Sequence, residues 1–164
     1  MNCGKRYTEH MTPYKHTQIG YLMLAVSLVV LVYFAWAQIM ARAEPPSVDS
    51  GTNLLVTVVM VLILFVLASF SALTVSIDEQ NISIRFGYGI FKKHFAINEI
   101  ASAKRVKNPW YIGWGIRYWF WPRMWIYNVS GFDAVELVMK NGKVYRIGTD
   151  VPEELETAIK AVLG

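Results

Sequence analysis

Aromatic and basic side chains alternate in one stretch of this 164-residue chain, between positions 104 and 125. Five of the six tryptophans fall there among five Lys or Arg residues: Trp110, Trp114, Trp119, Trp121 and Trp125, with Lys104, Arg105, Lys107, Arg117 and Arg123. Rings with a polar edge beside cations suit the headgroup region of an anionic membrane, where each Lys or Arg adds about 1 kcal/mol of attraction. All of these residues except Trp125 form the predicted lipid- or partner-binding set.

Two other interpretations of the stretch stay open. The rings could form a contact surface for a protein partner, or they could belong to a hydrophobic core, where Trp125 is expected because it begins a predicted strand. A similar choice applies to Lys92, Lys93 and His94, which either contact headgroups or form a solvated hairpin end.

Residue patterns typical of catalysis are absent from the sequence. His10, His16 and His94 lack the spacing of metal ligands, and no zinc-protease, nucleophile-elbow, phosphate-loop or dinucleotide motif occurs. Asp133 and Glu136 lie near a strand start, where two acids are more often surface residues than acid–base machinery. We therefore predict no enzyme activity, no catalytic residue, no metal and no cofactor.

Two long apolar runs must position the aromatic stretch. Residues 54–73 contain no charged side chain, and residues 19–37 form a second uncharged run. A helix of about 20 residues rises roughly 30 Å, the thickness of the hydrocarbon core of a bilayer. The predicted transmembrane hairpin covers residues 19–73, with spans at about 19–40 and 54–73. Residues 1–18 are predicted to be a short, loosely ordered arm.

The basic residues favour one orientation in the membrane. The arm carries Lys5, Arg6 and Lys15 against one acid, Glu9, whereas the connection at 41–53 carries only Arg42 as a basic residue. By the positive-inside rule, both termini are cytoplasmic and residues 41–53 are external. The net charge of +4 then lies beside a membrane, so we predict no nucleic-acid partner.

Alternating apolar residues predict a β domain directly after the second span, in residues 74–164. The pattern indicates an antiparallel hairpin at 73–86 and strands at 91–97, 101–106, 124–129, 134–140 and 143–147. Asn141-Gly142 favours a type I′ turn that pairs Val138 with Tyr145, and both faces of this hairpin carry apolar pairs. The 17 residues between Val106 and Met124 are predicted to be a projecting, functional loop.

The chain is predicted to end in an amphipathic helix that closes over the sheet. Asp150 is the expected N-cap, with Glu153 at capping-box spacing and Pro152 in the first turn. The apolar face is formed by Leu155, Ala158, Ile159 and Val162.

Three groups of residues carry a likeness to a known family: Gly115 to Tyr118, Trp125 to Glu136, and Asn141 to Lys143 with Arg146 to Asp150 and Pro152 to Leu155. Through them the chain resembles small bacterial membrane proteins that have a pleckstrin-homology-like (PH-like) domain after two transmembrane helices. The resemblance implies a PH-like barrel or sandwich of about seven antiparallel strands with a C-terminal capping helix. It also implies a place in the bacterial inner membrane, but most of that family has no assigned activity.

The expected function is a non-enzymatic, membrane-anchored interaction module. Its partners would be anionic lipid headgroups, a membrane-protein partner or a second copy of the chain. One alternative is an accessory or assembly subunit of a larger membrane complex, and another is an enzyme or transport component with a site between spans and domain. The absence of charged residues from both spans argues against an ion pathway.

Overall fold

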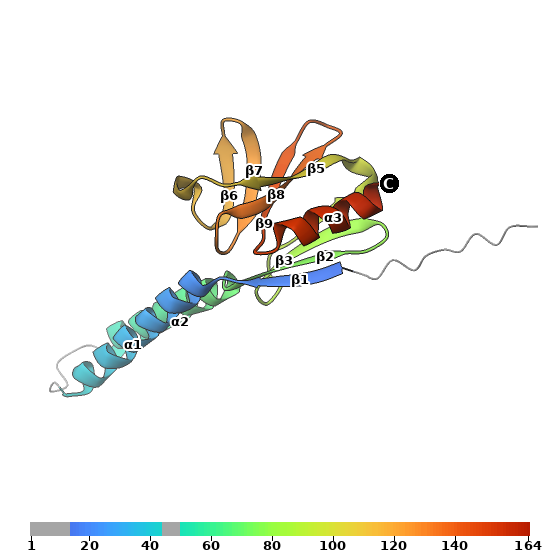
Figure 1. The fold of residues 1–164 in the computed structure, drawn as a ribbon. Helices are drawn as coiled ribbons and strands as arrows, with labels where there is room; N and C mark the ends of the chain where they lie inside the picture. The colour runs from blue at the N-terminus through green and yellow to red at the C-terminus, as the bar shows by residue number, and fades with distance from the viewer. Residues whose placement is uncertain (1–13, 44–49) are drawn as a thin grey trace, which may run out of the picture.

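The computed structural model describes residues 14–43 and 50–164. It shows a β-sandwich with a C-terminal helix against it, and a hairpin of two helices that leaves the sandwich on one side (Figure 1). The first sheet has the order β1-β2-β3-β4 and the second has the order β5-β8-β9-β7-β6.

The elements follow the chain in an order that inserts the helical hairpin between the first two strands. The first sheet contains β1 (Tyr14–Ile19), β2 (Ala72–Ile77), β3 (Asn81–Phe86) and β4 (Lys92–Ala96). The second contains β5 (Ile100–Lys107), β6 (Gly115–Phe120), β7 (Arg123–Asn128), β8 (Asp133–Met139) and β9 (Val144–Gly148). The helices are α1 (Tyr21–Ala43), α2 (Ser50–Ser69) and α3 (Pro152–Leu163), with short 3-10 turns η1 (Ile97–Glu99) and η2 (Trp110–Ile112).

Strand β1 corrects the prediction of a loosely ordered arm over residues 1–18. Tyr14 to Ile19 pair antiparallel with β2, while residues 1–13 lie outside the described residues. Long-range polar bonds hold the strand: the Gln18 amide donates to Ser130 O at 3.0 Å, and His16 Nε2 lies 2.6 Å from Asp150. Burial, with Glu154 and Asp150 nearby, raises the pKa of Tyr14 to about 12 and keeps its phenol neutral. Residues 14–18 therefore belong to the sandwich.

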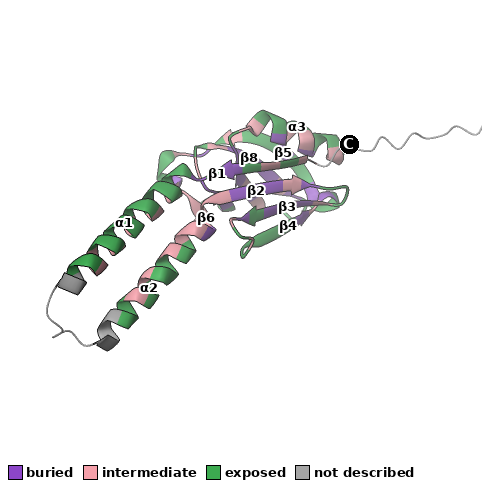
Figure 2. Cartoon of the chain, turned by 90° about the horizontal axis from the view of Figure 1, so that it is seen from below, coloured by how far each residue is buried: buried purple, intermediate pink, exposed green. Residues whose placement is uncertain are grey.

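The two helices of the hairpin differ in apolar length. In the part of the chain that the structure describes, Tyr21–Met40 is the one helical segment long and apolar enough to cross a membrane, and Leu54–Ser69 is a shorter apolar helix. The predicted second span reached residue 73, but α2 ends at Ser69 because Ala72 and Leu73 already pair with β1 and β3. The helices lie side by side (Figure 2). The Gln38 amide donates to Thr57 Oγ1 at 3.3 Å.

Helices and sandwich are joined almost without intervening residues. Only Gly20 separates β1 from α1, and only Phe70 and Ser71 separate α2 from β2. The Gly20 amide donates to Ser71 O at 2.7 Å and closes the junction. The side of the sandwich that meets the helices is therefore fixed by backbone pairing.

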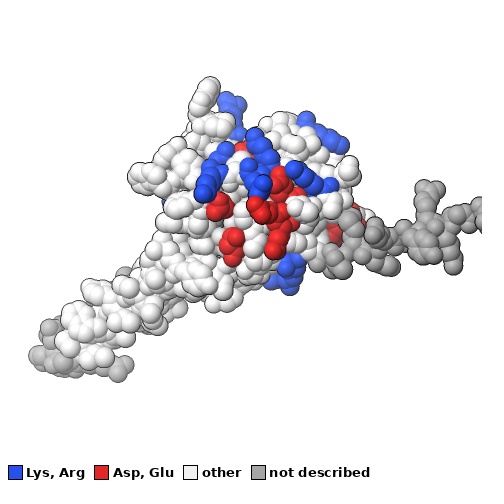
Figure 3. Space-filling view, in the orientation of Figure 1, with Lys and Arg blue, Asp and Glu red and all other residues white. Residues whose placement is uncertain are grey.

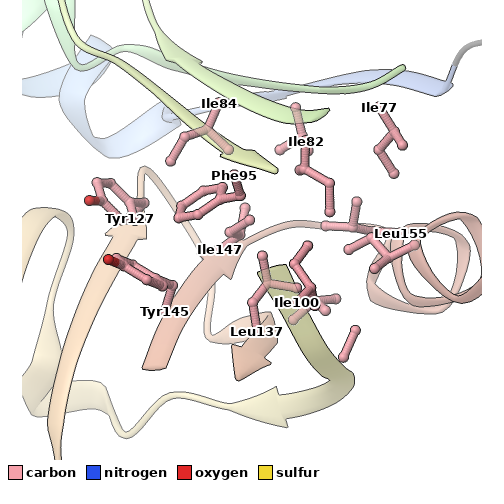
Figure 4. Packing of buried hydrophobic residues seen from close by; sticks show 14 of the residues in the cluster. Ile77, Ile82, Ile84, Phe95, Ile100, Tyr127, Leu137, Tyr145, Ile147 and Leu155 are labelled. Carbon is pink, nitrogen blue, oxygen red and sulfur yellow. The ribbon is translucent and has the colours of Figure 1, made fainter. Parts of the chain in front are cut away.

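The main core lies between the two sheets and under α3 (Figure 4). Ile82 and Ile84 face it from the first sheet, and Leu137 and Ile147 face it from the second. Leu155 and Ile159 of α3 are fully buried in the same cluster, as their helical spacing predicts. The C-terminal helix thus covers one open side of the sandwich, and this part of the predicted fold is confirmed.

The start of α3 differs from the prediction. Val151 is the N-cap residue and makes no side-chain capping bond. Asp150 instead contacts His16, and Thr149 Oγ1 accepts a hydrogen bond from the Val151 amide at 3.1 Å. The predicted capping box is wrong because a partner 134 positions away in the chain takes the Asp150 carboxylate.

The turn between β8 and β9 is longer than the predicted type I′ turn. Tyr145 pairs with Leu137 rather than Val138, and Val144 pairs with Val138. The Gly142 amide donates to Met139 O at 2.9 Å, and Gly142 alone in this turn has positive φ, at 78°. This geometry is a type I turn closed by a glycine bulge. Both faces of the hairpin are covered, because Val144 packs against a second cluster of Ile112, Met124 and Ile126.

The segment predicted as a 17-residue loop contains η2 and a complete strand, β6. Strand β6 pairs antiparallel with β7, and β7 pairs parallel with β9. The prediction of about seven strands, all antiparallel, is therefore wrong in two respects. Aromatic residues on both faces of β6 hide the alternation by which a half-buried strand is recognised.

The contact between the sandwich and α2 can be tested at Gly87. Gly87 and Gly142 both have positive φ, at 40° and 78°, so alanine strains either position by about 1–2 kcal/mol. Only at Gly87 would the new Cβ also lie 2.5 Å from Ser69 O, at the end of α2, whereas nothing lies within 4 Å at Gly142. We expect Gly87→Ala to lower the thermal midpoint of the detergent-solubilised chain clearly more than Gly142→Ala. Equal effects would contradict the packed junction.

Candidate functional site

Two of the predicted binding residues form ion pairs with acidic residues of the same chain. Lys104 Nζ lies 3.2 Å from Glu136, and Arg105 pairs with Glu153 and, at 2.8 Å, with Glu156. The side-chain hydrogen bond from Lys160, together with the charges of Lys160 and Arg105, lowers the pKa of the Glu156 carboxyl. Figure 3 shows positive and negative side chains mixed over this side of the sandwich. Lys104 and Arg105 are thus ion-paired within the fold, with side chains that are 63% and 49% exposed.

Glu136 forms the centre of a buried polar network on the outer face of the second sheet. Its side chain is only 10% exposed and accepts from Arg146 at 2.9 Å, while Arg146 also donates to Asn108 Oδ1 at 3.2 Å. Asp133 and Glu136 were both expected at the surface, but Glu136 lies in this buried network. Glu136 is buried and charge-paired with Arg146 and Lys104, so its carboxylate is not a free general acid or base.

The predicted tryptophans occupy different environments. Trp119 packs against the second cluster, and Trp114 is half-buried with its ring near Phe132. Trp110 is exposed beside Tyr111, and Trp121 is the most exposed of the five, at 89%. Trp125 was expected in the core, but it is 40% exposed and contacts Tyr118 near the sheet edge. Tyr111 contacts both Trp110 and Trp119, with ring centroids 6.1 and 5.7 Å apart, whereas Trp114 and Trp125 have other aromatic neighbours.

Strand β6, which contains Arg117 and Trp119 of the predicted set, runs away from the helices. Its first residue, Gly115, pairs with Asn128 close to the helix ends, and its last, Phe120, pairs with Arg123. Five residue steps in a strand cover roughly 17 Å. Figure 1 shows the β6–β7 turn, which contains Trp121, at the end of these strands that is remote from the helical hairpin. Lys107 and Arg117 remain exposed. Lys107 lies at the end of β5 opposite Ile100, and Arg117 Nε donates to Trp114 O at 3.2 Å.

Another group of apolar side chains surrounds the point where the helices leave. Two turns meet the helix ends, the β3–β4 turn and the β7–β8 turn (Figure 1). They expose the residues that we call the proximal rim: Tyr88, Ile90, Phe91 and Phe132. None belonged to the predicted set, because a Gly-x-Gly turn gives no indication in sequence of what it packs against.

Aromatic contacts hold two residues of the proximal rim against α2 and the residue that follows it. The Tyr88 ring stacks on Phe65 with centroids 6.2 Å apart, and Phe91 stacks on Phe70 at 5.3 Å. Phe65 lies one turn inside the end of α2 at Ser69, so Tyr88 reaches back along the helix. Even so, 73% of Tyr88 is exposed. The rim therefore presents an aromatic surface level with the last turn of an apolar helix.

Each histidine in the described part of the chain has a polar side-chain partner, and for His16 it is the Asp150 carboxylate. His94 Nδ1 lies 2.8 Å from Ser83 Oγ, but no carboxylate accompanies the pair and the neighbouring backbone amides belong to the sheet. No group of three His, Cys, Asp or Glu residues able to hold a metal occurs among residues 14–43 and 50–164. Comparison with protein-family models, curated proteins and solved structures finds no match for this chain.

The buried network makes a prediction about stability. Arg146→Met leaves the Glu136 carboxylate buried beside a single exposed partner, so we expect a loss of about 3 kcal/mol in the free energy of unfolding. Lys104→Met removes the partner that is 63% exposed and should cost less than about 1 kcal/mol. Denaturant unfolding of both variants in detergent measures the difference. Similar losses would mean that Arg146 does not neutralise the carboxylate.

Proposed function

We propose that this chain is a non-enzymatic, membrane-anchored interaction module. In this proposal α1 and α2 both cross a bacterial inner membrane, both termini are cytoplasmic, and the sandwich is a PH-like domain that contacts anionic lipid headgroups. The observation that carries it is the linker-free junction, at which Tyr88 stacks beside the last turn of α2. A sandwich attached in this way stays at the membrane surface.

The surface of the helical hairpin supports a lipid environment. Large apolar side chains such as Leu28, Val29 and Phe65 are exposed along both helices. A contiguous apolar surface of this size is unfavourable in water and is typical of membrane or partner contact. The α2 helix has 20 residues and rises about 30 Å, which matches the thickness of the hydrocarbon core. Its apolar segment, Leu54–Ser69, is shorter than the whole helix.

The proximal rim supports contact between the sandwich and the membrane interface. Tyrosine and other aromatic rings are enriched where membrane proteins meet the headgroup region. In this chain such rings surround the helix ends, whereas the mixed charges of α3 lie elsewhere on the sandwich. The two-sheet sandwich with its C-terminal helix is compatible with a PH-like domain, although the inserted helical hairpin and the parallel β7–β9 pair are additional features.

A membrane-protein partner is a second candidate, and one observation favours it. The β6–β7 turn exposes Phe120 and Trp121 at the end of the sandwich remote from the helices. Rings there are too far from the helix ends for the same bilayer to cover them. A partner that extends from the membrane could reach this turn.

The position of the rim can be measured with single-cysteine variants in a Cys3→Ser background. An environment-sensitive fluorophore is attached at position 88 or at position 121, and each protein is reconstituted into zwitterionic vesicles that contain nitroxide-labelled lipid. Both positions are exposed aromatic residues in β-hairpin turns, so they form a matched pair. We expect strong quenching at 88 and little at 121, because only Tyr88 lies beside α2. Quenching at neither position would refute membrane docking of the rim.

The orientation of the chain is a separate prediction. In the same Cys3→Ser background, a cysteine at Asn141 in the exposed β8–β9 turn should resist an impermeant thiol reagent in intact cells and react after permeabilisation. A cysteine at Ser47, outside the described residues, should react in intact cells. The reverse pattern would place the sandwich on the outer side of the membrane.

A further inference from the structure

The outer face of the first sheet is lined by cations and hydroxyl groups. Alternate residues of its strands point into the core, so the intervening residues point outward. The register aligns these outward residues in two rows across the four strands. One row is Lys15, Ser76, Ser83 and His94, and the other is Thr17, Thr74, Arg85 and Lys92. Neither row contains an acid.

This basic face, which we define by Lys15, Arg85, Lys92 and His94, differs in its pairing from the charged side near α3. Lys15, Arg85 and Lys92 form no ion pair with any residue in the described ranges, whereas Lys104, Arg105 and Arg146 each do. Arg85 and Lys92 are direct cross-strand partners. Like charges at directly opposite positions destabilise a sheet. An anion bound between them would remove that cost.

The basic face also has a hollow that could hold such an anion. A cavity of about 290 Å³ is lined by all four basic residues and by the hydroxyls of Thr74, Ser76 and Ser83. This size is near the lower end for small-molecule sites. Hydroxyl donors between Lys and Arg side chains are the groups that bind phosphate oxygens, and Arg does so through charge-assisted, often bidentate hydrogen bonds.

The hollow lies close to the level of the membrane surface in the proposed function. Thr17, in the row of Arg85 and Lys92, is three residues before Gly20, a distance of roughly 10 Å along the strand. The Arg85 and Lys92 side chains both pass close to Gly89 in the β3–β4 turn. A Cβ atom added to Gly89 would lie 2.9 Å from Arg85 Cδ and 3.0 Å from Lys92 Cε. They therefore lean toward the helix end, where the long side chains can meet headgroups.

We propose that the basic face is a binding site for a phosphate group, with Arg85 and Lys92 as its main ligands and Lys15, His94 and the hydroxyls around them. The proposal rests on the membrane-surface placement above when the phosphate belongs to an anionic phospholipid. A soluble phosphate compound presents the same chemistry. The Lys104–Arg123 segment is not required for this site.

The test uses the full chain in neutral detergent micelles. A titration with acyl-chain-labelled phosphatidylglycerol measures binding for the wild type, for Arg85→Gln with Lys92→Gln, and for the matched control Lys140→Gln with Lys143→Gln. The control removes the same charge from the exposed β8–β9 turn. We expect about thirtyfold weaker binding for the first variant, from two lost cations, and less than about threefold for the control. Equal binding by the two variants would overturn the site.

Thermal unfolding provides a readout that does not depend on lipid. Without anion, Arg85→Gln with Lys92→Gln should unfold at the same or a higher temperature than the wild type, because the cross-strand repulsion is gone. A lower midpoint would overturn the argument from like charges. Phosphatidylglycerol should raise the wild-type midpoint more than phosphatidylcholine, whose choline offsets the phosphate charge. Equal stabilisation by inorganic phosphate at matched ionic strength would support the site and assign it to a soluble phosphate.

The phosphate site and the proposed membrane placement can fail separately. Quenching at position 88 is measured in zwitterionic vesicles and does not need the basic face. If that label is quenched but the two double variants bind phosphatidylglycerol equally, the phosphate site fails and the membrane module stands. If the label is not quenched and only Arg85→Gln with Lys92→Gln loses binding, the phosphate site stands without the membrane placement.

Discussion

The pairing of β1 with β2 is the constraint on which the rest of the structure depends. The helical hairpin is inserted between these two strands, so their six paired positions bring the ends of α1 and α2 together. The Gly20 to Ser71 hydrogen bond closes the same point. Because the first sheet starts at this junction, its register decides which turns lie beside the helices and which lie at the remote end. The proximal rim and the basic face both follow from that register.

The parts of the fold that were predictable from sequence are those with local patterns. Strict alternation identifies β2 and β3, and helical spacing identifies the buried face of α3 with Leu155 and Ile159. Strand β1 was missed because Gln18 and His16 are satisfied by Ser130 and Asp150, more than 100 positions away. Strand β6 was missed because aromatic residues occupy both of its faces. In both cases the stabilising contacts are remote in sequence.

The candidate site was harder to predict because composition does not specify pairing. In the sequence Lys104 and Arg105 have no evident partner, yet both form ion pairs with acids of β8 and α3. From sequence, Lys92 could contact headgroups or belong to a solvated hairpin end, and the register places it opposite Arg85 with no acid in their row. A cation available for a ligand is one that the fold leaves unpaired. That property depends on register and long-range packing, which single-sequence patterns do not contain.

The same argument separates the two groups of exposed aromatic rings. Tyr88 contacts Phe65 near the end of α2, and Phe91 contacts Phe70 just after it, so burial in an interface would extend contacts that the chain already makes. Trp121 lies at the other end of the sandwich, one strand length from the start of β6. Rings of similar chemistry therefore have different possible partners: if the helical hairpin crosses a bilayer as proposed, only the end of the sandwich beside the helices lies at the membrane surface. In a tethered domain, distance from the tether selects among surfaces that composition alone would treat as equivalent.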